Sequence, residues 1–292
     1  MDQLFSPPRT PVEQQRMRQA HQAAARALLL PAAQGPESWG WQGRTLGRRV
    51  GNRWLRVVSQ PSAKPVSRLW DGAAAADAAL PRAIPRPRLV DVMDWNAGEH
   101  RYRAEVSELV PWPVLQHGGP VLEHEAGLPD VWWAELRGAL TALAGVSTHR
   151  VAVRQDWIDR NFPTYLGIPP VRITAWVTGH ADLHWANLSA DHLVIFDWES
   201  WGAVPRGYDE GLLHAYGLAA PRTAARIRKE FAHVLDTPHG RIGELVALAQ
   251  LLQVAARGHH PELRSDLELR AQHLIRQLAR SRTCGSMRHV CE

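Results

Sequence analysis

Apolar residues at helical spacing run through both ends of this chain. In the segment 13–30, Met17, Ala20, Ala24 and Leu28 recur at intervals of three and four, and Pro31 follows them. Such spacing predicts an amphipathic helix that ends before the proline. The same kind of pattern predicts helices over the ranges 129–145, 209–217, 221–235, 240–257 and 262–280.

Between residues 38 and 110 the pattern changes to short runs of β-branched and aromatic residues. Thr45–Val50 and Arg53–Ser59 flank Gly51-Asn52, a dipeptide typical of a tight turn, so a short antiparallel meander is expected. A helix over 67–79 is weakened by Gly72. Further extended segments are expected at 88–95, 101–110 and 173–177, with a hairpin-like pair of Leu188 and 193–197.

These patterns predict an α+β protein in three parts. Residues 1–35 form an N-terminal helical extension, 36–110 a small β-rich lobe, and 111–292 a larger helical lobe. The proline-bracketed stretch 109–120 is the natural hinge between the last two.

Composition and charge narrow the class of protein. Of 292 residues, 45% are hydrophobic and 22% charged, which is typical of a globular protein. No apolar stretch is long enough to span a membrane, and Cys284 and Cys291 are the only cysteines, so we expect a cytoplasmic protein without membrane contact. The formal net charge is +5, but the basic residues are scattered, which argues against a nucleic-acid partner.

The segment with candidate chemistry is His180-Ala181-Asp182 with Asn187 five residues later, followed by an apolar run that ends at Asp197. A carboxylate such as Asp182 can accept a proton or orient a hydroxyl group. The amide of Asn187 and the carboxylate of Asp197 offer the hard oxygen ligands that suit Mg²⁺. Phosphoryl transfer needs these parts, namely a positioned nucleophile and metal ions on the phosphate oxygens.

The segments Gly179–Asn187 and Phe196–Glu199 resemble the catalytic and metal-binding motifs of the aminoglycoside phosphotransferase and small-molecule kinase family. That resemblance implies a two-lobed protein-kinase-like fold. It also implies Asp182 as the catalytic base or hydroxyl-orienting residue, with Asn187 and Asp197 as Mg²⁺ ligands.

The resemblance further implies that ATP, or GTP, binds the β-rich lobe. No lysine stands at the position of the phosphate-binding lysine of such folds, so Arg56 is the best candidate and Lys64 the alternative. Asp71 or Asp77 is the expected acidic helix partner. The adenine is expected between the lobes, against the linker at Glu108–Val110, with Leu188 as the floor beneath the base.

Asp209 and His180, near the motif, have predicted structural roles, whereas two roles are possible for His184. Asp209 is expected to open a helix that braces the catalytic loop, and His180 to hold the loop in shape. His184 is compatible with either a ligand contact or a hydrogen-bonded loop position. Ala181 stands where the family usually has glycine, which would strain the backbone if φ there is positive.

The sequence thus predicts an O-phosphotransferase that moves the γ-phosphoryl group of ATP or GTP to a hydroxyl of a small molecule. The alternative is a nucleotide-binding pseudoenzyme or regulatory protein of the same fold. From Gly202 to Glu292 there are thirteen Arg or Lys and nine Asp or Glu residues, which disfavours a polycationic acceptor. An antibiotic or related metabolite remains among the acceptors, and a role in antibiotic resistance, biosynthesis or metabolism stays open, as does the oligomeric state.

Overall fold

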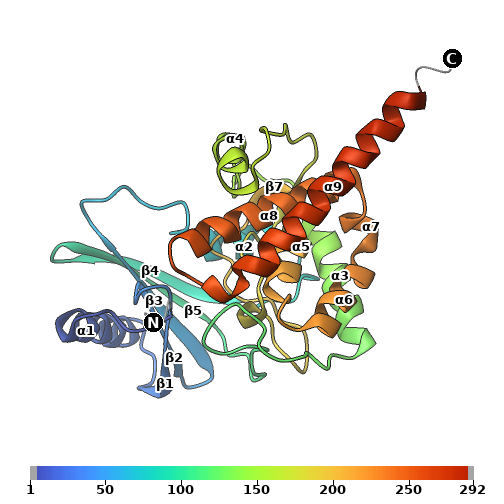
Figure 1. The fold of residues 1–292 in the computed structure, drawn as a ribbon. Coiled ribbons are helices and arrows are strands. Elements are labelled where there is room, and N and C mark those ends of the chain that lie inside the picture. Colours follow the sequence, from blue (N-terminus) through green and yellow to red (C-terminus); the bar gives the residue numbers. More distant parts are fainter. Residues whose placement is uncertain (1–4, 289–292) are drawn as a thin grey trace. The chain divides into compact units, whose positions relative to one another are not determined.

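The computed structural model describes residues 5–288, which form two compact units (Figure 1). The first unit contains the chain up to Pro113 together with His117–Gly119 and Ser189–Glu199. The second contains Val114–Gln116, Pro120–Leu188 and the chain from Ser200 onward. Of the candidate residues, Asp197 therefore belongs to the first unit, and Asp182 and Asn187 belong to the second.

The first unit is built on a five-stranded antiparallel sheet with the strand order β1-β2-β3-β5-β4. The tight turn predicted at Gly51-Asn52 joins β2 to β3, and Gly51 has the positive φ of 61° that such turns require. The expected meander is confirmed. The strands are β1 (Ala33–Trp39), β2 (Thr45–Val50), β3 (Arg53–Pro61), β4 (Leu89–Ala97) and β5 (His100–Glu108).

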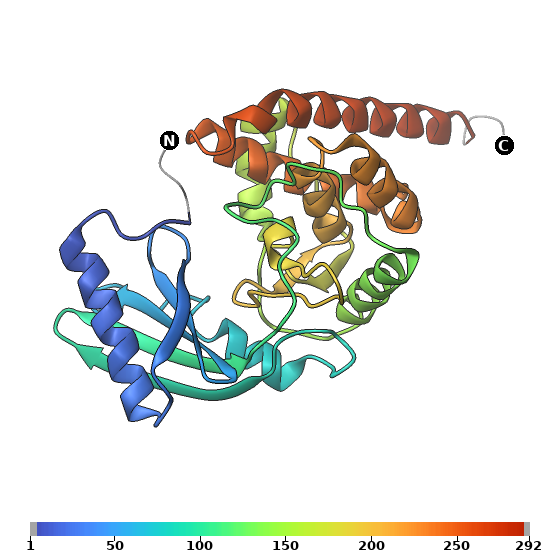
Figure 2. The ribbon, with the colours of Figure 1, turned by 90° about the horizontal axis from the view of Figure 1, so that it is seen from below.

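Helix α1 (Pro11–Ala27) covers one face of this sheet (Figure 2). It begins where the Thr10 side chain accepts a hydrogen bond from the backbone N–H of Glu13, a typical N-cap. Its buried stripe includes Met17 and Ala24, which join one core with Leu55 and Val57 of β3 and with residues of β2 and β5. Because strand residues alternate between faces, Trp54 and Arg56 lie on the opposite face of β3 from this core.

The second unit is mainly helical. Its core includes α8 (Pro238–Ala256), which packs against α5 (Tyr208–Tyr216) and α9 (Arg264–Arg288). The two-stranded ribbon of β6 (Trp176–Gly179) and β7 (Gly202–Pro205) precedes these helices. The remaining elements are α3 (Asp130–Ala144), α4 (Gln155–Asn161), the π-helix η1 (Phe162–Leu166), the 3₁₀ turns η2 (Trp185–Asn187) and η3 (Pro261–Leu263), α6 (Pro221–Glu230) and α7 (Ala232–Leu235).

Two local predictions need correction. The helix expected over 67–79 is the shorter α2 (Gly72–Ala79), and Gly72 begins it instead of interrupting it. A Cβ on Gly72 would lie 2.2 Å from the backbone oxygen of Glu199, so only glycine permits this approach. The pair expected from Leu188 and 193–197 forms no strands, because the side chain and backbone of Ser189 bind Val194 and close a tight loop.

None of the helices described between residues 5 and 288 has the length and apolar character needed to cross a membrane.

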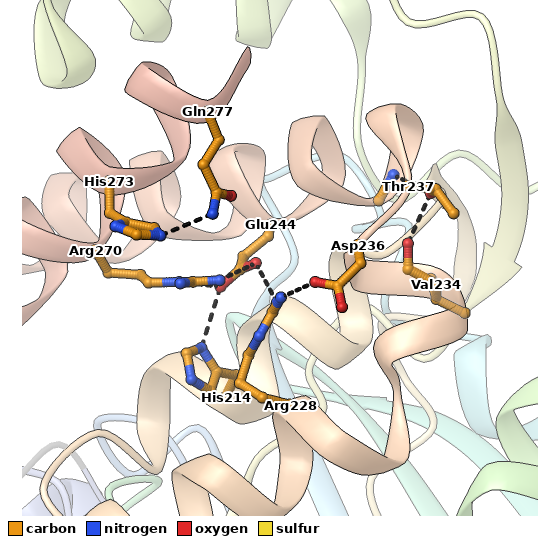
Figure 3. A network of polar contacts seen from close by, with 10 residues as sticks. His214, Arg228, Val234, Asp236, Thr237, Glu244, Arg270, His273 and Gln277 are labelled. Carbon is orange, nitrogen blue, oxygen red and sulfur yellow. Dashed lines mark hydrogen bonds and ion pairs between the residues drawn. The ribbon is translucent and has the colours of Figure 1, made fainter. Parts of the chain in front are cut away.

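A buried network of ion pairs and hydrogen bonds ties four helices of the second unit together (Figure 3). Glu244 of α8 is fully buried and binds both Nε and Nη2 of Arg270 of α9, at 2.7 and 3.0 Å. Arg228 of α6 binds the same carboxylate at 3.0 Å, and Nδ1 of His214 of α5 lies 3.1 Å from it. Burial opposes the charge of Glu244, but His214 and Arg270 outweigh it and lower the pKa of this carboxyl to about 2.

We expect Glu244→Gln to lower the free energy of unfolding by about 3 kcal/mol at pH 7, since the two arginines lose their anion. The carboxyl is displaced from an ordinary pKa of 4.5 to about 2 in the fold. The ionised carboxylate therefore contributes its full stability at a pH above the pKa of the unfolded chain. This contribution declines by about 1.4 kcal/mol per pH unit as the pH falls from that pKa toward the lower pKa of the folded protein. Denaturant unfolding of both proteins at matched pH measures this. A gap that is the same at pH 7 and pH 3.5 would contradict it.

Candidate functional site

The loop that carries Asp182 is held by the side chain of Asp209. Oδ2 of Asp209 accepts from the backbone N–H of His180 at 2.6 Å, and Oδ1 accepts from the N–H of Ala181 at 2.9 Å. Asp209 is buried in the first turn of α5, and a Cβ on Gly179 would lie 2.7 Å from its Oδ2. The bracing role expected for Asp209 is confirmed, and glycine at position 179 is what allows its close approach.

Ala181 has a left-handed backbone with φ of 68°. For a residue with a Cβ this conformation costs on the order of 1 kcal/mol, so the two bonds from Asp209 hold the chain in a strained turn. His180 is fully buried, and its Nδ1 accepts from the N–H of Asp182 at 3.3 Å, which supports the structural role expected for it. The Asp182 side chain itself is 41% exposed, so its carboxylate remains accessible to a substrate.

Two acceptors orient the amide of Asn187. Its Nδ2 donates to the backbone carbonyl of Asp182 at 3.0 Å and lies 3.1 Å from Nε2 of His184. A carbonyl only accepts, so the nitrogen of the amide has to face Asp182, and Nε2 of His184 accepts its second hydrogen. Burial, followed by the charges of His180 and His260, lowers the pKa of His184 to about 3, so the ring is neutral. Among the hydrogen bonds of residues 5–288, none reaches Oδ1 of Asn187, which is available to a ligand.

Aromatic rings surround this loop in the second unit. The ring of Tyr216 lies edge-on to His184, with centroids 5.8 Å apart, and edge-on to His260 at 6.2 Å. Burial raises the pKa of the Tyr216 hydroxyl, and the negative charge of Asp182 adds to the shift. Tyr216 therefore lies within reach of the charge of Asp182, and His260 lies beside Tyr216, so both are candidates for acceptor contact. They come from α5 and from the start of η3, and the motif spacing gave no signal of either.

In the first unit Arg56 is the centre of an arginine–carboxylate cluster, formed with Arg44, Glu105, Asp197 and Glu199. Arg56 donates to Glu199 at 2.5 Å and to Glu105 at 3.3 Å, and its Nη1 lies 3.4 Å from Oδ1 of Asp197. Arg44 donates to the other oxygen of Glu199. Burial opposes the charge on Arg56, but Asp197, Glu199 and Glu105 together raise its pKa.

The cluster corrects the expected partner of Arg56. Asp77 of α2 lies 3.3 Å from Arg88 instead. The acid that the sheet supplies to Arg56 is Glu105, which lies directly opposite it on the neighbouring strand β5 and accepts from it at 3.3 Å. The alternative phosphate contact, Lys64, is exposed in the turn after β3. The sequence offered no signal for Glu105, because the register of β3 against β5 was unknown.

Asp197 adopts a left-handed backbone with φ of 57°, which aspartate tolerates better than most residues. Burial raises the pKa of its carboxyl, and the charge of Glu199 adds to this against the effect of Arg56. Glu199 is more deeply buried than Asp197, yet Arg56 and Arg44 lower its pKa. The three carboxylates of the cluster therefore face two guanidiniums, with an excess of negative charge when all are ionised.

Asp197 in the first unit and Asn187 in the second each offer an oxygen of the kind that Mg²⁺ binds. Oδ1 of Asp197 is buried and accepts no hydrogen bond within residues 5–288, although Nη1 of Arg56 lies 3.4 Å from it. Oδ1 of Asn187 is available. Magnesium takes one or two carboxylates together with substrate phosphates and water. No group of three or more His, Cys, Asp or Glu side chains within residues 5–288 is placed to hold a metal.

The residues expected around adenine are distributed over both units. Glu108 and Val110 line a cavity of about 430 Å³ in the first unit, together with Arg53, Trp112 and the segment 85–87. Leu188 belongs to the second unit, where it is fully buried and its carbonyl accepts from the N–H of Leu115 at 2.8 Å. The expected position of the adenine stays a prediction.

We expect Ala181→Gly to stabilise the protein by about 0.5–1 kcal/mol, because glycine relieves the left-handed strain and loses part of the gain through its freer unfolded chain. Ala142→Gly, inside helix α3, is the matched control and should cost up to about 1 kcal/mol. Denaturant unfolding of the three proteins measures both changes. Destabilisation by Ala181→Gly would show that the backbone at this position is not strained.

We also expect His184→Leu to weaken Mg²⁺ binding at least about tenfold, since the amide of Asn187 loses the acceptor that orients it. His184→Gln places an oxygen near the position of Nε2 and should restore most of the affinity. The readout is the Mg²⁺ concentration that gives half of the nucleotide-dependent rise in Tm, with each variant compared to its own ligand-free Tm. Equal Mg²⁺ affinity of the leucine variant and the wild type would contradict the orienting role.

No protein-family model and no curated protein matches this sequence. Solved structures do match it. A thermostable mutant of aminoglycoside phosphotransferase APH(4)-Ia, in its apo form, is 13% identical over 88% of this chain and 98% of its own, with a TM-score of 0.55. Another structure of an APH(4)-Ia variant, with a TM-score of 0.53, holds ADP and hygromycin B.

Two further kinases have the same fold. A choline/ethanolamine kinase family protein from Mesorhizobium loti is 16% identical over 90% of this chain and 96% of its own, with a TM-score of 0.56. Amicoumacin kinase hAmiN, in complex with AMP-PNP, Ca²⁺ and Ami, is 12% identical over 91% and 96%, with a TM-score of 0.54. The chain therefore has the fold of the aminoglycoside phosphotransferases and small-molecule kinases that its motifs resemble.

Proposed function

We propose that this protein is a phosphotransferase that moves the γ-phosphoryl group of ATP or GTP to a hydroxyl of a small molecule. The observation that carries the proposal is the accessible carboxylate of Asp182 on a loop fixed by Asp209, with the amide of Asn187 bonded to the backbone of Asp182 itself. Small-molecule kinases share the fold, and structures of two of them hold a nucleotide or its analogue. Both findings support the proposal.

Asp182 would accept the proton of the acceptor hydroxyl. The hydroxyl oxygen would bond to the γ-phosphorus while the bond from the γ-phosphorus to the oxygen that bridges the β- and γ-phosphates breaks. Asn187 and Asp197 would hold Mg²⁺, which neutralises charge on the phosphate oxygens when bound. Arg56 would contact the phosphates with its planar fork of donors, in place of a lysine. Glu108, Val110 and Leu188 remain the proposed contacts of the base.

The acceptor we propose is a hydroxyl compound that is neutral or anionic. The neutral ring of His184 lies 3.9 Å from Asp182, Tyr216 packs edge-on to His184, and His260 packs edge-on to Tyr216. Aromatic surface of this kind suits an uncharged acceptor. Glu244, the fully buried carboxylate of the helical unit, is already neutralised by Arg228 and Arg270. A polycationic acceptor would need carboxylates whose charge is not already neutralised by arginines of the protein.

A second candidate function is a nucleotide-binding regulatory protein without transfer activity. It is favoured by one observation, the ion-pair contact of Arg56 with Asp197, in which the proposed metal ligand is already engaged by a cation. The two candidates share nucleotide binding and differ in turnover, so a measurement of turnover by the wild type separates them.

We expect Asp182→Asn to lower turnover by about 10²- to 10⁴-fold, because the amide cannot accept the hydroxyl proton, and to leave Mg-nucleotide binding nearly intact. Nucleotide binding is read as a rise in Tm with Mg-ATP or Mg-GTP. Turnover is read as ADP or GDP release over a panel of nucleosides, macrolides, choline and hygromycin B, with EDTA as the metal-free control.

The possible results separate the hypotheses. Full activity of the asparagine variant would remove Asp182 from the chemistry. A nucleotide-dependent Tm rise without turnover of any acceptor by the wild type would favour the regulatory protein. No response to either nucleotide would count against both functions.

A further inference from the structure

Two arginines of the first unit converge on a single carboxylate. Arg44 follows Gly43 in the loop between β1 and β2, and its Nη2 binds Oε1 of Glu199. Arg56 of β3 binds Oε2 of the same residue at 2.5 Å. Each oxygen of Glu199 is thus held by a different guanidinium, from two separate parts of the sheet.

The contact with Glu199 leaves part of Arg44 without a partner. The Nε of Arg44 is buried and has no hydrogen-bond partner within residues 5–288, and the Arg44 side chain is 36% exposed. The Glu199 side chain, at 11%, is much less exposed. Two guanidiniums therefore hold one anionic group, and the Nε of Arg44 meets no acceptor within residues 5–288.

A phosphate group matches this pair better than a carboxylate does. Guanidinium forks bind phosphate oxygens in bidentate, charge-assisted geometry. A phosphate has enough oxygens to accept from two arginines and still offer one to a metal, whereas a carboxylate has only two. The loop between the first two strands contains Gly40 and Gly43, and Gly43 has a positive φ of 69°, so Arg44 comes directly after a backbone turn that glycine permits.

We propose that Arg44 and Arg56 form a two-arginine clamp for the polyphosphate of the nucleotide, and that Glu199 is the internal anion that fills the clamp when no nucleotide is bound. This inference rests on the proposed function, because it takes the ligand to be a nucleoside polyphosphate. It adds Arg44 as a phosphate contact and gives Glu199 the role of a competitor. Phosphate binding then requires both arginines to exchange Glu199 for phosphate oxygens.

Binding of tripolyphosphate and of ATP in EDTA, measured by calorimetry, tests the clamp without the contribution of metal. We expect Glu199→Gln to tighten both affinities about tenfold, since the amide keeps the shape of the side chain and removes the competing charge. We expect Arg44→Gln to weaken both about tenfold. Glu37→Gln removes the same charge from an ion pair of the sheet with Arg18 of α1, and should change neither affinity.

The double variant Arg44→Gln with Glu199→Gln tests the coupling between the two residues. If Glu199 acts by holding the arginines, its substitution should tighten binding less when Arg44 is absent. Glutamine at position 199 that weakens or does not alter polyphosphate binding would overturn the competitor role. Unchanged affinity of Arg44→Gln, which replaces a part-exposed loop residue and leaves the core intact, would overturn the clamp.

These outcomes are distinct from failure of the proposed function. If the wild type binds Mg-ATP with a rise in Tm and neither the wild type nor Glu199→Gln binds tripolyphosphate in EDTA, the clamp is wrong and the kinase proposal stands. If no variant binds any nucleotide, with or without Mg²⁺, both are wrong. Binding of tripolyphosphate by Glu199→Gln but not by the wild type would support the clamp in its strongest form.

Discussion

The carboxylate of Asp209 is the constraint on which the catalytic loop depends. It accepts from two successive backbone N–H groups, of His180 and Ala181, and so fixes the chain immediately before Asp182. Ala181 has a strained left-handed backbone, and without these hydrogen bonds the loop would relax out of that conformation. The position of the candidate base is therefore decided by a side chain 27 residues further along the chain, counted from Asp182 to Asp209.

Asn187 is oriented through the same loop. Its amide uses one hydrogen on the carbonyl of Asp182 and directs the other at His184, so the oxygen is the atom that remains for a ligand. His184 needs no charge for this purpose, and its burial keeps the ring neutral. The loop thus presents an exposed carboxylate and an available amide oxygen. The backbone before Asp182 and the amide of Asn187 are both fixed by hydrogen bonds within the second unit, before any substrate binds.

Charge in the first unit is organised differently from what kinase-like motifs suggest. Arg56 takes its acidic partner from the adjacent strand, through Glu105, and the helix α2 contributes no carboxylate to it. Glu199 then couples Arg56 to Arg44. The planar guanidinium of an arginine has five donors and can bind several carboxylates at once, whereas the compact ammonium of a lysine does so less readily. The substitution of lysine by arginine and the gathering of three carboxylates around it are consistent with each other.

The sequence by itself determined the order of the elements, the turn at Gly51-Asn52 and the residues of the catalytic motif, because periodicity and short motifs are local properties. The partner of Arg56 was decided only by the tertiary structure, since Glu105 is 49 residues away and the register between β3 and β5 brings them together. The strained backbone of Ala181 was likewise decided by Asp209, a distant acceptor. Helical and strand patterns record which face of an element is buried, and they carry no information on which distant charge that face will meet.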